Sequence, residues 1–454
     1  MNNQNSPNYQ AMPIVHQQVA GIDIGSKFHV VAVGDNPQTD VKEFGVSTQE
    51  LFELAQFLAK HEVKHVAMEA TGGYERPLVT VLQEAGFDVL ITAGANTKNY
   101  RRFKSDVSDA IHIRTLHSLG LLPPIFITDE FSAFIRPLVR MRRTLIEDSA
   151  NYIRRIQKAL RAINVRLDAA MADSNSVSGL AIIEAICQGQ EDPSKLAELA
   201  HKSCKKSPAE ITKLLTGNWN DSVRFEVRSC YRIFEKIRAE MADLDAELDK
   251  FFTDHTQSLI KPEAKNTRKP RTDKNSPKLP IEQYAHQLLG VNLNEIPGFG
   301  RDALLTFMAE VGEAIGRFTS AKAFSKWLGF TPNNKASGGK ILSRKTLKNK
   351  STLPNTFRMV ANSIGNMKGS NPLANFFKRV AFKSSRLSAI TATARKLSVV
   401  IYKMLTTGSA YEPAKMERDQ AQVKVLQIKK IKKNLHKFGI SIADLGWTVD
   451  SQAT

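Results

Sequence analysis

The chain has 454 residues, with 64 Lys and Arg against 45 Asp and Glu, and a formal net charge of +19. That length allows two or three domains with ordinary cores, and the basic surplus indicates a polyanionic partner, most simply nucleic acid. Three scattered cysteines without metal-ligand spacing favour a reducing compartment. Because no apolar run reaches the roughly 18 residues of a membrane span and no signal peptide is present, we expect a soluble, cytoplasmic protein without a membrane partner.

Alternating strands and helices are predicted for residues 19–125, which gives an α/β domain. Short β-branched runs predict the strands, and apolar residues at i, i+3 and i+4 predict the helices. In chain order, the predicted elements are two strands within 19–34, a helix at 48–60, a strand at 65–69, a helix at 77–84, a strand at 88–92 and a helix at 105–120.

Two long helices dominate residues 131–255, with a small helical insert predicted at 168–228. The second helix has apolar residues in alternating steps of four and three between Ile237 and Phe251, which is a heptad seam. The two helices could therefore pair as an antiparallel hairpin or dimerise. The first helix is predicted to present a basic outer face made of Arg136, Arg140, Arg142, Arg143, Arg154 and Arg155.

The remainder of the chain is predicted as three segments. Residues 256–280 contain prolines and many basic residues but no apolar periodicity, which predicts a flexible linker. Residues 281–411 read as a third, mainly helical domain. Residues 412–454 form a tail with a basic amphipathic helix near its middle.

Four carboxylates stand out in the N-terminal domain: Asp23, Glu69, Asp106 and Asp109. Asp23 and Glu69 lie in strand-like apolar runs, where a carboxylate is costly unless it is paired or bound to metal. Asp106 and Asp109 share one helix face, where a cation would relieve their repulsion. Such a set can hold divalent cations in a phosphodiester-cleaving site. The segment around Asp23 alone also fits an actin-like ATPase, although the phosphate loop of that class does not follow it.

Two downstream motifs suggest contact with phosphates. Ile296-Pro-Gly-Phe-Gly300 precedes a predicted helix and indicates a helix-hairpin-helix, with an ordinary tight turn as the alternative. Ser337, flanked by glycines and lysines, is a candidate nucleophile, with a plain loop as the alternative. The candidate nucleic-acid contacts are Gly298, Gly300, Arg301, Lys335, Lys340, Arg344, Lys345, Arg140 and Arg143.

Together these segments resemble the Piv-type DEDD recombinases, meaning the Piv DNA invertase and related insertion-sequence transposases. Residues 19–411 contain the matching stretches in family order, with departures at Ala336, where the family usually has Gln, at Ser105, where it usually has Thr, and across 343–358. The matching stretches are Gly21-Ile-Asp-Ile-Gly25, Met68-Glu-Ala-Thr-Gly-Gly-Tyr-Glu75, Lys104-Ser-Asp-Val-Ser-Asp-Ala110, Ile296-Pro-Gly-Phe-Gly300, Met308-Ala-Glu-Val-Gly312, Trp327-Leu-Gly-Phe-Thr-Pro332, Ala336-Ser-Gly338, and Ala394-Arg-Lys-Leu397 with Tyr402.

The resemblance implies an N-terminal RuvC-like domain of RNase H fold, in which Asp23, Glu69, Asp106 and Asp109 bind Mg²⁺, with Mn²⁺ as the alternative ion. It implies a coiled coil that forms a dimer or tetramer, and a C-terminal transposase domain whose Ser337 attacks DNA. Its implied partners are the DNA of the element ends and target and a structured guide RNA, on a bacterial nucleoid. The alternatives are a hydrolytic or junction-resolving nuclease of the same fold that uses water, and a non-catalytic nucleic-acid-binding protein.

Overall fold

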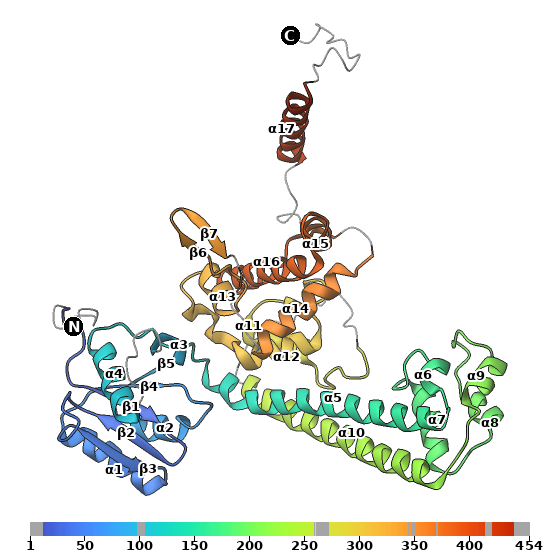
Figure 1. Cartoon of the computed structure of the whole chain (residues 1–454), viewed down its shortest axis with the longest axis horizontal. Helices are drawn as coiled ribbons and strands as arrows, with labels where there is room; N and C mark the ends of the chain where they lie inside the picture. Colours follow the sequence, from blue (N-terminus) through green and yellow to red (C-terminus); the bar gives the residue numbers. More distant parts are fainter. Residues whose placement is uncertain are drawn as a thin grey trace, which may run out of the picture. The chain divides into compact units, whose positions relative to one another are not determined.

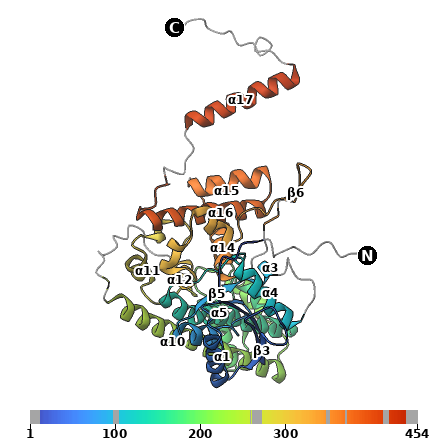
Figure 2. The ribbon, with the colours of Figure 1, turned by 90° about the vertical axis from the view of Figure 1, so that its left-hand side faces the viewer.

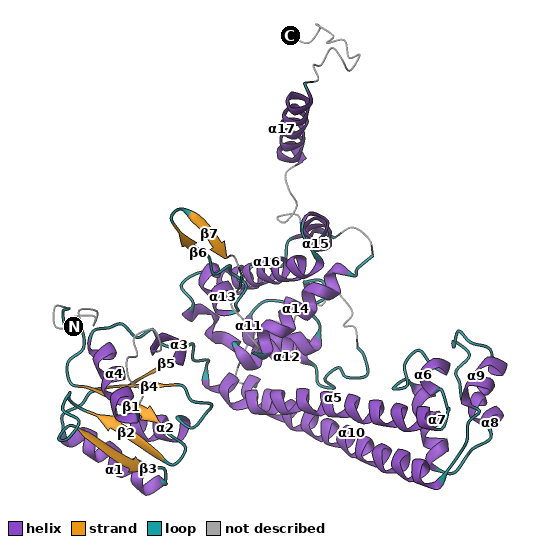
Figure 3. Cartoon of the chain, viewed as in Figure 1, coloured by secondary structure: helices purple, strands orange, loops and turns teal. Residues whose placement is uncertain are grey.

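The computed structural model describes residues 12–97, 105–257, 259, 272–343, 345–346, 351–368, 371–413 and 420–439. The chain divides into two compact units, Met1–Ile127 and Thr128–Thr454 (Figure 1). The first unit contains a five-stranded sheet, and the regular structure in the described ranges of the second unit is helical apart from one two-stranded sheet (Figure 3). No helix in the described ranges is long and apolar enough to cross a membrane.

The sheet of the first unit has the strand order β3-β2-β1-β4-β5. β2 pairs antiparallel with both β1 and β3, whereas β1, β4 and β5 run parallel. The carboxyl ends of the parallel strands therefore meet at one edge, the usual location of ligands in open α/β sheets. The strands are β1 Val19–Ile24, β2 Phe28–Ala32, β3 Val41–Gly45, β4 His65–Glu69 and β5 Asp88–Thr92.

Helices pack on both faces of this sheet. Ile22 and Met68 face the core shared with α1 and α2, and the alternate residues Gly21 and Ala67 face α4. A Cβ atom at Gly21 would collide with backbone atoms of α4, so a glycine is needed for the helix to pack this closely on β1. The helices are α1 Thr48–Lys60, α2 Arg76–Glu84, α3 Gly94–Thr97 and α4 Asp106–Ser118.

Three histidines meet in the first unit near the end of α4. The ring of His16 stacks on His117 with 5.0 Å between centroids and lies 5.4 Å from the ring of His65. Nδ1 of His65 in turn lies 2.9 Å from a carboxylate oxygen of Asp88. His117 is 3 % exposed, and its burial, together with the nearby His16 and His65, lowers its pKa to about 4.

We expect the first unit to lose stability as the pH falls from about 6.5 to about 4. In that window an unfolded His117 is protonated whereas the folded one is neutral, so acid lowers the free energy of unfolding, by at most about 3 kcal/mol. Hydrogen exchange of α4 amides in the full chain, corrected for intrinsic rates, measures this change. His117→Gln should flatten the pH dependence, and the exposed control His61→Gln should keep it. An equally steep dependence in His117→Gln would assign the effect to another group.

A long helical hairpin begins the second unit. α5 Glu130–Ala162 and α10 Asp221–Thr256 lie side by side (Figure 1), and Arg142 of α5 pairs with Asp245 of α10. Further along the hairpin, Ile156 and Phe234 share a core, so the two helices run antiparallel. The heptad seam is used within this chain, because Met241, Leu244 and Leu248 are buried.

The insert between the two long helices is shorter than predicted. The prediction placed its end at residue 228, but α10 begins at Asp221, where the side chain of Asn220 accepts a hydrogen bond from the amide of Val223. The regular heptad spacing of apolar residues begins only at Ile237, so the sequence pattern does not identify the first turns of α10 as part of the long helix. The helices of the insert are α6 Leu167–Ala170, α7 Val177–Cys187, α8 Pro193–Glu198 and α9 Pro208–Leu215.

The predicted mainly helical character of residues 281–411 is confirmed. Phe299, Phe324 and Phe357 pack together in its core, and α15 lies along α16 (Figure 2). The α-helices are α11 Ile281–Leu289, α12 Arg301–Glu310, α13 Ala321–Trp327, α14 Thr352–Gly365, α15 Pro372–Lys383 and α16 Arg386–Thr407, with α17 Gln420–Phe438 in the tail. Short 3-10 helices span Leu293–Glu295 and Gly312–Arg317, and the strands are β6 Lys335–Ser337 and β7 Lys340–Ser343.

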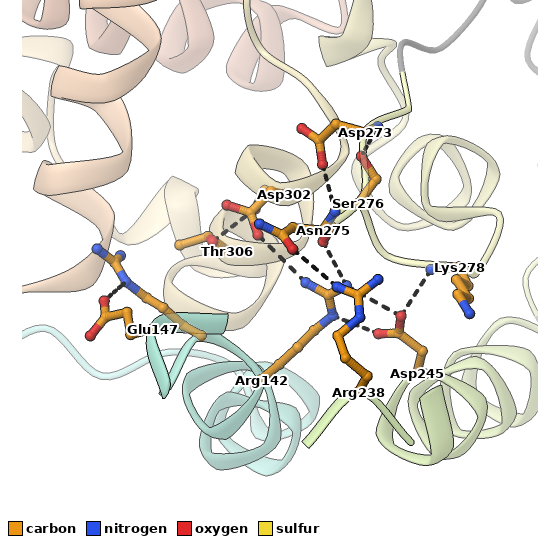
Figure 4. Close-up of polar contacts among 11 residues, drawn as sticks. Arg142, Glu147, Arg238, Asp245, Asp273, Asn275, Ser276, Lys278, Asp302 and Thr306 are labelled. Carbon is orange, nitrogen blue, oxygen red and sulfur yellow. Dashed lines mark hydrogen bonds and ion pairs between the residues drawn. The ribbon is translucent and has the colours of Figure 1, made fainter. Parts of the chain in front are cut away.

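The predicted basic outer face of α5 is wrong for Arg142 and Arg136. The Arg142 side chain is 2 % exposed and binds both carboxylate oxygens of Asp245 at 2.5 and 3.2 Å (Figure 4). Arg136 is 20 % exposed and donates to the carbonyl of Ala309. Asp245 of α10 and the carbonyl of Ala309 in α12 bind these two arginines, so both side chains face other elements of the second unit instead of solvent.

The buried ion pair of Arg142 and Asp245 also anchors the end of the predicted linker. Arg142 donates to the carbonyl of Asn275 at 2.9 Å, and the amide of Lys278 donates to Asp245 at 3.0 Å (Figure 4). Arg238 of α10 binds the same segment through the carbonyl of Lys274. Residues 272–280 are therefore fixed on the helical hairpin, whereas residues 258 and 260–271 of the predicted linker lie outside the described residues.

Candidate active site

Asp23 and Glu69 lie at the ends of neighbouring parallel strands. Ile22 is paired in register with Met68, so Asp23 and Glu69 are the next residues along each strand. Side chains alternate along a strand, which puts both carboxylates on the sheet face that α4 covers. Both residues are half-buried. The two acids predicted from separate apolar runs therefore belong to one side of one sheet.

Two residues that the sequence did not reveal surround Glu69. The hydroxyl of Thr97 donates to its Oε2 at 2.8 Å. A Cβ atom at Gly94 would collide with its Oε1, so the glycine leaves room for the carboxylate. Both residues belong to the short α3, directly after β5, and their position at a strand end is the only sequence signal that could have identified them.

Asp106 and Asp109 lie in the first turn of α4, where the helix dipole favours negative charge. The helix begins at Ser105, whose hydroxyl accepts from the amide of Ser108 at 3.1 Å. Asp109 is 6 % exposed, whereas Asp106 is exposed. The close packing of α4 on Gly21 brings Asp109, the neighbour of Ala110, to the sheet face that carries Asp23.

The chemistry of these four acids fits a divalent metal ion. Carboxylate oxygens are the hard ligands that Mg²⁺ and Mn²⁺ bind, and three of the four side chains are at least partly shielded from water. Across the described part of the chain, however, no three His, Cys, Asp or Glu side chains are arranged to hold a metal ion. The donor types and their placement at strand ends fit the ion, but the carboxylates must converge to bind it.

Ser337 is in the second unit, at the tip of a small β-hairpin that was not predicted. It pairs with Lys340 across a turn made of Gly338 and Gly339, which have φ values of 54° and 75°. Two-residue hairpin turns with positive φ at both positions favour glycine, which explains the Ser-Gly-Gly sequence. Ser337 is exposed, so its hydroxyl is accessible to a large substrate.

Basic residues accompany Ser337 on this hairpin. Lys340 and Lys345 are exposed, and the carbonyl of Lys345 accepts from the amide of Asn333 at 3.0 Å, which ties the base of the hairpin together. The side chain of Lys335 and the whole of Arg344 lie outside the described residues. Lys340 and Lys345 therefore add positive charge to the surface near Ser337, and their contact with nucleic acid remains a prediction.

The segment at 296–300 lies between the 3-10 helix Leu293–Glu295 and α12. Gly298 has φ 79° and packs inward, because a Cβ atom there would lie 3.2 Å from Cγ1 of Ile364. Gly300 is exposed at the N-terminus of α12, with open space around it. Arg301, 14 % exposed, has its Nε 3.0 Å from a carboxylate oxygen of Glu282. Of these three candidate contacts, Gly300 is the one open to a ligand, and the helix-hairpin-helix remains a prediction.

The two remaining candidate contacts lie on α5 and are engaged within the second unit. Arg140 binds both carboxylate oxygens of Glu310 at 2.8 Å, which connects α5 to α12. Arg143 lies 3.4 Å from Glu147 on its own helix. Arg140 is still 46 % exposed at its side chain, and contact with DNA by either arginine remains a prediction.

Two family models match the chain. A DEDD transposase model of the IS110 type matches residues 20–165, and the model of the transposase IS116/IS110/IS902 family matches residues 291–375. The first match contains the four acids, and the second contains Ser337. None of the curated proteins compared with the chain matches it.

Proposed function

We propose that this chain cleaves and rejoins DNA strands through a phosphoserine intermediate. Its matches to transposase models of the IS110, IS116 and IS902 type support the broader function of a transposase or recombinase of an insertion sequence. The observation that carries the proposal is the exposed serine at the tip of a basic hairpin, in a chain that also places partly buried carboxylates along one face of a sheet.

The four acids are proposed to hold Mg²⁺, with Mn²⁺ as the alternative ion. When bound, the ion would polarise the scissile phosphate and stabilise the leaving 3′-oxygen. The chain's own residues hold the ligands in place. Thr97 orients Glu69 through its hydrogen bond, and Gly21 keeps the helix of Asp109 close to the strand of Asp23.

Ser337 is proposed as the nucleophile. Its Oγ would form a bond to phosphorus while the bond from phosphorus to the 3′-oxygen breaks, the serine losing its proton and the leaving oxygen gaining one. The phosphoserine keeps the energy of the broken bond, so a 3′-hydroxyl can later attack it, rejoin DNA and release the serine. A serine hydroxyl is a weak nucleophile on its own, so the reaction also requires the metal-binding acids at the same phosphodiester.

The proposed partners are the DNA of the element ends and target, a structured guide RNA, and further copies of this chain in a dimer or tetramer. The net charge of +19 supports a nucleic-acid partner of either kind. Binding should weaken steeply as salt is added, because phosphate contacts release counterions.

Asp109→Asn tests the metal-binding half of the proposal. The amide has nearly the shape of the carboxylate but lacks its charge, so we expect cleavage of element-end DNA to fall about 100-fold or more while the fold is retained. Cleavage of a labelled substrate with Mg²⁺, and with Mg²⁺ plus EDTA, measures the effect. Glu84→Gln, an exposed acid at the end of α2, is the matched control and should cleave normally. Wild-type cleavage that survives EDTA would refute metal dependence.

A further inference from the structure

A groove of about 650 Å³ lies in the second unit at the base of the hairpin that carries Ser337. One wall is formed by the residues that flank the hairpin, including Pro332 and Thr346, which form a β-bridge to each other. The other wall is the face of α16 that carries Thr391, Arg395 and Lys396. Neither family match nor the proposed reaction assigns a role to this groove.

The groove lies within reach of a nucleic-acid strand held at Ser337. Pro332 and Ser337 are five positions apart in the sequence, and a strand advances about 3.3 Å per position, so their Cα atoms are at most about 17 Å apart. That span covers a few nucleotides of a single strand. A strand whose phosphate meets Ser337 can therefore place a nearby base at the groove.

The lining of the groove combines aromatic, aliphatic and cationic groups. Nζ of Lys396 lies 4.9 Å from the centroid of the Phe376 ring, and both residues line the groove. The guanidinium of Arg379, which is not a lining residue, lies 5.7 Å from the same ring. Leu387, also a lining residue, is 77 % exposed. Among the described residues that line the groove, Arg395 and Lys396 are charged and none is acidic. Aromatic surface beside cations is the usual composition of a site for unpaired nucleotides.

We propose that this groove binds an unstacked base of a single nucleic-acid strand, close to the phosphodiester that Ser337 attacks. The charges favour an anionic ligand, and a concave site of this volume suits one or two nucleotides rather than a double helix. The base would lie against the apolar lining, while Arg395 and Lys396 would face the backbone phosphates. The inference rests on the proposed function, because it identifies a second contact for the same substrate.

Thr391→Trp tests the inference by filling the groove. The probes are short single-stranded oligonucleotides, one DNA and one RNA, each prepared intact and with a single abasic position moved along the strand. The wild-type chain should bind the intact strand roughly 10-fold more tightly than the strand with the abasic position at the groove. Thr391→Trp should lose this difference for the same probe. Thr406→Trp makes the same change at an exposed position of the same helix, outside the groove, and should keep it.

Each outcome decides for or against the base site. Preference for the intact strand with one probe alone, or with both, supports the site and identifies DNA, RNA or either as its source. The site is overturned if Thr391→Trp still binds the intact strand more tightly than the abasic strand. It is also overturned if Thr391→Trp weakens the binding of both strands by the same factor. A competition experiment adds an acidic peptide to each variant with the oligonucleotide bound. If the peptide displaces the oligonucleotide from Thr406→Trp, whose groove is open, but not from Thr391→Trp, whose groove is filled, the groove binds a protein partner instead. Because binding needs no cleavage, failure of the phosphoserine mechanism would show separately, as a missing covalent adduct.

Discussion

Ser337→Ala should abolish the covalent protein–DNA adduct while leaving DNA binding close to the wild-type level. The substitution removes the only atom proposed to bond to phosphorus, so cleavage should fall at least about 10³-fold. The hairpin should keep its structure, because its pairing uses the backbone and an exposed serine-to-alanine change typically alters stability by less than about 0.5 kcal/mol. The adduct is measured as labelled DNA that remains attached to the protein in a denaturing gel.

Ser343→Ala is the matched control, since Ser343 ends the other strand of the same hairpin. It should form the adduct normally. An adduct that persists in Ser337→Ala would assign the covalent link to another side chain. Cleavage by the wild-type chain without any adduct would favour water as the nucleophile, and therefore a hydrolytic nuclease.

The second large effect is expected from Asp245→Ala, on stability. The variant removes the carboxylate that binds the buried guanidinium of Arg142 through two hydrogen bonds and leaves it only the exposed carboxylate of Asp302, 3.8 Å away. It also removes the acceptor for the amide of Lys278. Breaking a buried ion pair on one side typically costs about 3–5 kcal/mol. Chemical denaturation of the full chain, followed by the fluorescence of Trp219 and Trp327 in the second unit, should show a transition at lower denaturant.

Two further variants separate this effect from a general loss of charge. Glu147→Ala removes the partner of Arg143, and because Glu147 is 66 % exposed, the change should cost less than about 1 kcal/mol. Replacing Arg142 with Met and Asp245 with Leu together should recover most of the lost stability, because no unpaired charge remains buried. A loss below about 1 kcal/mol in Asp245→Ala would mean that Arg142 finds a new partner.

Several elements were predictable to the residue because local signals agreed there. α1 has apolar residues at helical spacing and a capping box between Ser47 and Glu50, and β4 and β5 are short apolar runs between turns. β3 was missed because it is an edge strand in which Phe44 alone is fully buried, so no alternating pattern marks it. The hairpin of β6 and β7 was missed because it is a turn with almost no core of its own.

The acids of the candidate site were recognisable because a carboxylate in an apolar run is conspicuous. The residues around them were not, since nothing in the sequence marks Gly94 and Thr97 before the short α3 that follows β5 places them beside Glu69. The error at Arg142 has a similar origin. Its partner Asp245 is 103 positions away, and helical periodicity cannot distinguish a solvated arginine from one that is paired inside.

The missing side chain of Gly21 makes this position intolerant of substitution. A methyl group there would meet the backbone of α4 at Ala110 and Arg114, which cannot rotate aside as a side chain could. The helix would have to move outward and would carry Asp109 with it. A genetic screen for inactive variants should therefore recover Gly21 as readily as Asp23, even though glycine contributes no chemical group. In this domain, the close packing of α4 on β1 is as necessary to the proposed site as the carboxylates themselves.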